Sequence, residues 1–512
     1  MSVDPPVTGA SGDESNLQDF GYRQELRRVL KLFAVFAVAF SIVSITTGIF
    51  LNYGFGITHL GPASIWLWPI AVAGQFLVAL VIAELSTRIP LAGANYQWGA
   101  RLVGPRYGWF IGALGILYGA VGLPGIMLEG LSPLLISVLG LDVNNTRLQL
   151  FIALAALVIA FLINLISVQL AARVNNVAVF TEIIGTVVLG VLLFVLWVGD
   201  VKPGGQPASF LGNHHGIFHQ PFWYAFVLAG LMGIYTLVGF EQAADLAEET
   251  VHARRVIPRA ILWSVGLAGG LGMIALIGFT VAIPDLSAVQ QAPEPLVVIT
   301  QHWLGDGLTR VFLAIVVFSM FALAVVGAAA GARLIYAMSR DNMLPFSGLW
   351  RRINPRSRTP IPALLVGLGI GMVLMIYGYL QGNAFGTLVS ATALIPYIIY
   401  LLTVIAYAMR RRSLEAIPGA FSLGRAGPAV MAVALVWLAA VILVLVLPSE
   451  FRPAVYVVAG WMVLAAVWYL LVLRRRLRDG TAAVGMSARP AHPPVGGTPG
   501  PVREAAEGAP ER

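Results

Sequence analysis

The chain has 512 residues, of which 58% are hydrophobic and only 11% are Asp, Glu, Lys or Arg, whereas about a quarter of the residues in an ordinary soluble domain are charged. Its mean hydropathy is +0.84, and so few charges cannot cover so much apolar surface in water. This composition excludes a soluble enzyme, a secreted disulfide scaffold and a disordered chain, and the lack of cysteine excludes thiolate metal sites. We therefore interpret apolar runs of about 18 residues or more as membrane spans.

The apolar runs predict twelve membrane-spanning helices and no soluble domain between them. Each run is long enough to cross about 30 Å of hydrocarbon at a rise of about 1.5 Å per residue. The spans must be helical, because lipid offers no hydrogen-bond partner to free backbone groups. In chain order the predicted spans are 32–52, 65–85, 107–131, 148–168, 177–198, 221–244, 260–281, 311–336, 361–380, 384–408, 429–447 and 455–473.

The basic residues predict the orientation of these spans. With both termini in the cytoplasm, 28 of the 32 Lys and Arg residues fall inside, and only Arg147, Lys202, Arg310 and Arg452 fall outside. This distribution accounts for the net charge of +8 without a nucleic acid partner. The bias toward Arg, Ala, Gly and Val suggests a bacterial inner-membrane protein. Residues 1–29 and 476–512 lack an apolar period and are predicted to be disordered cytoplasmic tails around a membrane domain at 30–475.

Small and polar residues interrupt the first and the sixth predicted spans, at Ser44, Thr46, Thr47 and Gly48 and at Gly239, Glu241 and Asp245. Both are the first helix of a group of five, and matched interruptions in two halves indicate inverted repeats with a site at the membrane midplane. At an unwound turn, free N–H groups suit a carboxylate and free carbonyls suit an ammonium group. The alternative is tight packing, since small residues also let membrane helices approach closely.

Four motifs stand at regular places in the predicted helices. The first lies in helix 1, the second follows helix 2, the third lies in and after helix 6, and the fourth ends helix 8. They are SITTGIF at 44–50, Glu84-Leu85-Ser86 with PLAGANYQW at 90–98, Gly239-Phe240-Glu241 with Glu248-Glu249 and RRVIP at 254–258, and RLIYAMSRDNMLP at 333–345. These motifs resemble those of the amino acid–polyamine–organocation permeases, and most closely the amino acid/choline transporter branch, which includes GABA and choline permeases.

The resemblance implies an all-helical fold of the leucine-transporter type, with helices 1–5 in 32–198, helices 6–10 as an inverted repeat in 221–408, and helices 11 and 12 in 429–473. It implies alternating access for amino acids or small amines. By this analogy the substrate-binding residues are Ser44, Thr46, Thr47 and Gly48, which offer amides to a carboxylate, and Tyr235, Thr236 and Gly239, which offer carbonyls to an amino group. Tyr118 is a further side-chain candidate, although tyrosines in spans commonly serve packing or interfacial anchoring.

Three acids, two within the predicted spans and Asp245 just after the sixth, are candidates for proton coupling. Ionisable groups in a bilayer are costly, so their presence there suggests a function. Glu182 stands where proton-coupled relatives often carry a lysine, so it can carry the proton or instead bond free backbone groups of helix 1 or 8. Glu241 follows the helix 6 interruption, where it can carry the proton or hold the unwound turn. Asp245 lies one turn later, either beside a cationic substrate or in a wet cytoplasmic vestibule, at a position where GABA- and choline-type relatives tend to have histidine.

Two further predictions concern charges and cations on the cytoplasmic side. Glu248 and Glu249, with Arg333 and Arg340, are predicted to form a cytoplasmic gate or brace. The stretch of helix 8 at 325–333, VVGAAAGAR, offers no hydroxyl oxygens, although a bound cation needs several oxygen ligands. This argues against sodium coupling. No phosphate-binding or dinucleotide fingerprint is present, and we predict no cofactor and no metal site.

These features together predict a secondary active transporter for amino acids or related amines, with proton symport favoured. Its partners would be a small substrate (an amino acid, GABA, a polyamine or a choline-like amine), protons and membrane lipid. An exchanger of the same fold is the main alternative, and the sequence does not separate the two. A membrane enzyme would need a polar catalytic group such as histidine at mid-membrane depth, and a nutrient sensor would need an added signalling domain, so both are disfavoured.

Overall fold

The computed structural model describes residues 28–483, apart from 167, 218–219, 355–358, 384, 415–416 and 418. Within that part of the chain the regular elements are all helical, and twelve helical segments are long and apolar enough to cross a membrane. The prediction of an all-helical protein with twelve spans is therefore confirmed. The tail residues 1–27 and 484–512 lie outside the described residues, so their predicted disorder stays a prediction.

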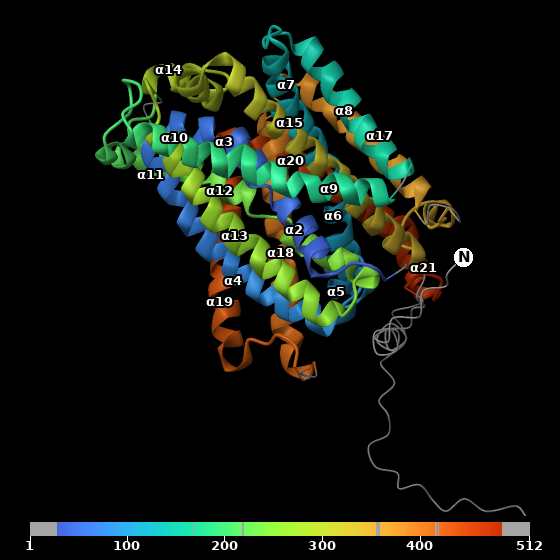
Figure 1. Cartoon of the computed structure of the whole chain (residues 1–512). Helices are drawn as coiled ribbons and strands as arrows, with labels where there is room; N and C mark the ends of the chain where they lie inside the picture. The colour runs from blue at the N-terminus through green and yellow to red at the C-terminus, as the bar shows by residue number, and fades with distance from the viewer. Residues whose placement is uncertain are drawn as a thin grey trace, which may run out of the picture.

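The spans are built from α-helices, several of which continue into short 3₁₀ or π-helical segments (Figure 1). The α-helices are α2 (Leu32–Val43), α3 (Ile45–Leu60), α4 (Leu67–Arg88), α5 (Ala94–Leu102), α6 (Pro105–Ile126), α7 (Ser132–Leu139), α8 (Thr146–Ile166), α9 (Val168–Glu182), α10 (Leu189–Val198), α11 (Phe222–Ala229), α12 (Leu231–Thr236), α13 (Ala253–Val281), α14 (Leu286–Gln291), α15 (Pro295–Arg340), α16 (Ser347–Trp350), α17 (Ile361–Leu380), α18 (Ser390–Arg410), α19 (Gly427–Val446), α20 (Arg452–Trp468) and α21 (Arg474–Arg478).

The first and sixth spans are broken at the positions that the sequence indicates. Ser44 separates α2 from α3 and adopts a left-handed conformation with φ of 39°. In the sixth span α12 ends at Thr236, and a 3₁₀ helix, η5 (Phe240–Glu249), begins after Gly239, whose φ is 88°. A left-handed turn ends the hydrogen-bonded ladder, and only glycine adopts it without steric cost. Both breaks therefore leave backbone groups that other parts of the chain must satisfy.

Two elements differ from the sequence prediction. Helix α15 runs from Pro295 to Arg340, whereas the predicted span covers only 311–336; the extension includes a kink at Gly305, whose φ is 71°. Helix α5 follows the second span and is too short to cross a membrane, so a search for long apolar runs passes over it. Its residues Tyr96, Gln97 and Trp98 are nevertheless almost fully buried. In Figure 1, α5 and α14 lie at opposite ends of the helical bundle.

Burial divides the spans into an inner and an outer group. The most apolar windows of the third and tenth spans are 78% buried within the protein, whereas that of the twelfth span is only 11% buried. Few residues of α20 are thus buried, whereas α6 and α18 each pack against several other helices. Exposed apolar side chains on outer helices, such as Val436, Tyr456 and Leu464, suit contact with lipid. A site shielded from lipid must lie among the inner helices.

Candidate functional site

The break in the first span is capped by side chains of the protein itself. The carboxylate of Glu182, which is 1% exposed, accepts a hydrogen bond of 3.3 Å from the Thr46 amide and lies within hydrogen-bond reach of the Ile45 amide and the Ser44 hydroxyl. The Thr47 amide donates to Ser44 Oγ at 3.2 Å. The amides of Thr46, Thr47 and Gly48 therefore all have acceptors within the chain. The sequence left two roles open for Glu182, and one of them, a bond to the backbone of helix 1, agrees with this contact.

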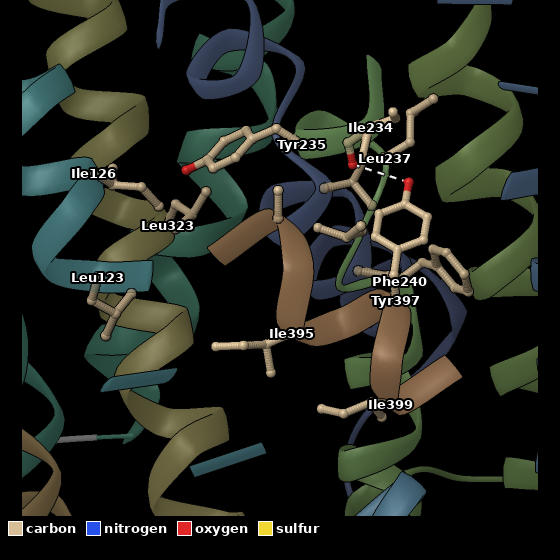
Figure 2. Packing of buried hydrophobic residues seen from close by; sticks show 14 of the residues in the cluster. Leu123, Ile126, Ile234, Tyr235, Leu237, Phe240, Leu323, Ile395, Tyr397 and Ile399 are labelled. Carbon is tan, nitrogen blue, oxygen red and sulfur yellow. Dashed lines mark hydrogen bonds between the residues drawn. The ribbon is translucent and has the colours of Figure 1, made fainter. Parts of the chain in front are cut away.

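The break in the sixth span is held by side chains from two other helices. Gln75 of α4 donates to the Leu237 carbonyl at 2.7 Å, and Tyr397 of α18 donates to the Ile234 carbonyl at 3.1 Å, as Figure 2 shows. The Tyr400 hydroxyl accepts a hydrogen bond of 2.9 Å from the Gly239 amide and donates to the Glu241 carboxylate. Glu241, which is 4% exposed, thus helps to fix the unwound turn.

A central cavity of about 100 Å³ lies between the two breaks and suits a small molecule. Its walls come from α2 and α3, the start of α5, α6, the sixth span, α15 and α18. Among the described residues that line it, none is Lys, Arg or His. The polar members are Ser44, Thr47, Asn95, Tyr96, Tyr118, Tyr235, Glu241, Gln242, Asp245 and Thr392.

Tyr235 offers a polar group to this cavity that has no partner within the described chain. The side chain is 6% exposed, and its hydroxyl makes no hydrogen bond there. Figure 2 shows the ring pointing toward Ile126 and Leu323, which also line the cavity, and away from Tyr397. A buried hydroxyl without a partner is costly, so a ligand that supplied a donor or acceptor there would bind favourably.

The structure brings together only part of the predicted substrate set. Ser44, Thr47, Tyr118 and Tyr235 line the cavity, together with the predicted coupling residues Glu241 and Asp245. The other predicted contacts do not line it: Thr46 turns toward the fifth span, where its hydroxyl meets that of Thr186 at 2.6 Å, while Gly48 packs against Thr236. Gly239 belongs to the turn that Tyr400 holds and is not among the lining residues. Glu182 does not line the cavity either.

Comparison with known proteins agrees with this architecture. Residues 30–472 match the family model described as amino acid permease. The chain belongs to the amino acid permease family. It is 27% identical to the amino-acid permease BAT1 of Arabidopsis thaliana over 86% of this chain and 92% of that protein. It is 28% identical to the rice homologue of BAT1 over 86% of this chain and 89% of that protein.

A fungal relative extends the comparison toward amines. The permease is 24% identical to a putative polyamine transporter of Candida albicans over 90% of this chain and 88% of that protein. The three relatives come from plants and a fungus, and none of their names mentions choline. The bacterial source and the choline branch that the sequence suggested therefore stay predictions.

The cytoplasmic end predicted for the permease carries two ion pairs between the sixth span and α15. Arg333 Nε lies 2.7 Å from the carboxylate of Glu249, and Arg340 lies 3.4 Å from the carboxylate of Glu248. Glu248 also accepts a hydrogen bond from the Ala92 amide, just before α5. Together with the Ala92 hydrogen bond, these pairs join the predicted gate residues across three segments, which are the sixth span, α15 and the residues just before α5.

Sequence reasoning missed Gln75, Tyr397 and Tyr400, the side chains that hold the helix 6 break. Each lies in an otherwise apolar run and carries no motif. Only their position opposite Leu237, Ile234 and Gly239 gives them a role, and that position depends on how the helices pack. The sequence does show that these polar residues lie in predicted spans. It does not show which backbone group each of them bonds.

A second cavity, of about 530 Å³, lies toward the other end of the permease and includes Glu129 and Glu294. Burial, with the nearby Glu129 carboxylate, raises the pKa of Glu294 from about 4.5 to about 8. A raised folded-state pKa contributes stability that is complete below the unfolded value and is lost as pH rises through the folded value. The unfolded chain loses this proton near pH 4.5, whereas the folded permease keeps it until about pH 8, so the stability of the permease falls as pH rises between these values.

We expect the Glu294→Gln variant to lose part of this pH dependence. Thermal unfolding of the detergent-solubilised permease would be followed by tryptophan fluorescence from pH 5 to pH 8, about the range between the unfolded and folded pKa values. The unfolding midpoint of the wild type should fall more steeply with rising pH than that of the variant. Identical slopes would contradict a buried, proton-binding Glu294. The exposed Asp306 provides a control, since Asp306→Asn should leave the slope unchanged.

Proposed function

We propose that this permease moves amino acids or related amines across a membrane by alternating access, with its N- and C-termini in the cytoplasm. The observation that carries the proposal is the cavity between two interrupted helices, 1 and 6, lined by two carboxylates and the partnerless Tyr235 hydroxyl. A site where half-helices meet near the middle of the membrane is typical of transporters built from inverted repeats. The family membership supports amino acids or amines as the transported class.

We further propose that transport is coupled to protons and that Glu182 carries the coupling proton. Its carboxylate is bound to the amides at the start of α3, so protonation weakens an interaction that holds the helix 1 break, because a neutral carboxyl is a poorer acceptor than a carboxylate. Glu241, bonded to Tyr400 at the helix 6 break, is the second candidate for the same role. The lack of hydroxyls at 325–333 supports protons over sodium.

Uptake into proteoliposomes tests both proposals. The purified permease would be offered labelled neutral amino acids, GABA, arginine, putrescine and choline, with and without an inward proton gradient. We expect the wild type to accumulate at least one substrate only with the gradient. We expect Glu182→Gln to accumulate at least about tenfold less substrate than the wild type, which corresponds to about 1.4 kcal/mol of driving force. Asp306→Asn, which removes an exposed carboxylate far from both breaks, is the matched control.

Three outcomes would contradict these proposals in different ways. Accumulation that ignores the gradient but requires preloaded substrate would indicate an exchanger and return Glu182 to a structural role. Gradient-driven uptake that survives in Glu182→Gln but is lost in Glu241→Gln would move the coupling group to helix 6. Failure to move any member of the panel would overturn the transport proposal for these substrates.

A further inference from the structure

The start of α3 is an anion-binding position that the protein itself fills. The first N–H groups of a helix lack intrahelical acceptors, and together with the helix dipole they attract negative charge. In this permease the Thr46 amide donates to the Glu182 carboxylate, and the Thr47 amide donates to Ser44 Oγ. The next amide, that of Gly48, donates to the Ser44 carbonyl at 3.0 Å. None of these three amides is left for a carboxylate on a substrate.

The central cavity offers negative charge and acceptors, but no replacement anion site. Glu241 and Asp245 line it, and its described lining lacks Lys, Arg and His. Arg333 acts electrostatically on Asp245, but its guanidinium is itself paired with Glu249 at 2.7 Å. The carbonyl oxygens of Tyr235 and Val238, two lining residues, accept no hydrogen bond from the described part of the chain. These groups suit an ammonium ion, whereas a substrate carboxylate would find only neutral donors, such as the Tyr235 hydroxyl, and no cationic side chain in the described lining.

We propose that Glu182 fills the position at the helix 1 break that a substrate carboxylate would otherwise take, so that the cavity selects small aliphatic amines and diamines without a carboxylate. Glu182 is thereby a specificity-determining residue, although it lies outside the cavity. The inference rests on the proposed transport function, and it names the substrate class of the same site.

Competition between carboxylates gives the selectivity its physical basis. An amino acid that used the helix 1 amides would have to displace Glu182 and leave a side chain that is 1% exposed without its hydrogen bonds. A buried carboxylate without partners is strongly unfavourable, and two carboxylates at one helix end repel each other where the dielectric constant is low. A diamine avoids both costs and adds an ammonium group next to Glu241 or Asp245.

The experiment compares each diamine with its parent amino acid on the full-length protein. Binding of labelled putrescine and ornithine, and of cadaverine and lysine, would be measured by scintillation proximity on the purified permease in detergent. These pairs differ only in the carboxylate. We expect the wild type to bind each diamine at least about tenfold more tightly, a difference of about 1.4 kcal/mol. Equal binding, tighter binding of the amino acids or no binding of either diamine would overturn the inference.

Two variants test whether the capped amides cause the preference. Glu182→Ala frees the Thr46 amide, and Ser44→Ala frees the Thr47 amide. Each variant should therefore bind the amino acid more tightly, which lowers the ratio of the affinity for the diamine to the affinity for the amino acid. Glu182→Gln keeps an oxygen acceptor at the same place and should retain more of the ratio than Glu182→Ala. An unchanged ratio in whichever of the two alanine variants folds would overturn the inference.

Failure of the inference and failure of the proposed function are separable. Binding does not require transport, so diamine-selective binding without uptake would support this inference while contradicting the transport proposal. Gradient-driven uptake of amino acids, together with binding of the amino acids that equals or exceeds that of the diamines, would support the transport proposal and contradict this inference.

Discussion

Replacing Glu84 with alanine is expected to destabilise the permease by about 3–5 kcal/mol, the cost of breaking a buried ion pair by removing one partner. The Glu84 carboxylate is fully buried and lies 3.2 Å from Arg88 and 2.9 Å from Arg411. It also accepts hydrogen bonds from Ser422 Oγ at 2.9 Å and from the Leu423 amide at 3.2 Å. Its removal leaves two guanidinium groups, 8% and 14% exposed, without their shared counter-ion.

This cluster joins three parts of the chain that are distant in sequence. Glu84 and Arg88 end the second span, Arg411 follows the tenth span, and Ser422 lies in the loop before α19. We therefore expect the loss to appear as a lower thermal unfolding midpoint of the whole permease in detergent, with little change in the substrate preference of any protein that survives.

An exposed ion pair provides the matched control for Glu84. Arg478 and Asp479 lie 3.3 Å apart, but their side chains are 77% and 56% exposed. Exposed pairs contribute about 0–1 kcal/mol, so Asp479→Ala should leave the midpoint almost unchanged. Equal midpoints for Glu84→Ala and Asp479→Ala would show that the buried cluster contributes no more than a surface pair.

The sequence was sufficient to predict the spans and the two breaks, because these features are local. Twelve apolar runs give twelve helices regardless of how the helices pack. Ser44 and Gly239 mark the breaks because small or polar residues stand out in lipid-like runs. The extension of α15 to Pro295 escaped prediction, because the segment around Gly305 mixes polar and apolar residues and contains a kink.

The site was predicted only in part, because side-chain direction at a break depends on the neighbouring helices. Thr46 and Thr47 are adjacent in the sequence, yet Thr46 faces Thr186 of the fifth span and Thr47 lines the cavity. The sequence suggested two roles for Glu182, as a proton carrier or as a partner of backbone groups. The hydrogen bond from the Thr46 amide shows the contact that the second role requires, but no linear pattern relates residue 182 to residue 46.

Gly48→Ala is expected to disrupt the contact between the two broken helices and to abolish most uptake. A Cβ atom at position 48 would lie 1.9 Å from Thr236 Oγ1 and 2.5 Å from its Cβ and Cγ2 atoms. Thr236 cannot turn aside easily, because it is 1% exposed and its hydroxyl donates to the Met232 carbonyl at 2.6 Å. The first and sixth spans must therefore separate, at a cost of about 1–3 kcal/mol for overpacking, and the separation falls beside both breaks.

A compensating substitution distinguishes this steric effect from a role of Gly48 in binding substrate. Removing the opposing side chain in the double variant Gly48→Ala, Thr236→Gly restores the space, so both the unfolding midpoint and the uptake should recover part of their wild-type values. Gly270→Ala is the control, because a Cβ atom there meets no atom within 4 Å and should leave both properties unchanged. Normal uptake in the single variant would show that the two helices do not need this close approach. Lost uptake at a wild-type midpoint, without recovery in the double variant, would instead place Gly48 in direct contact with the substrate.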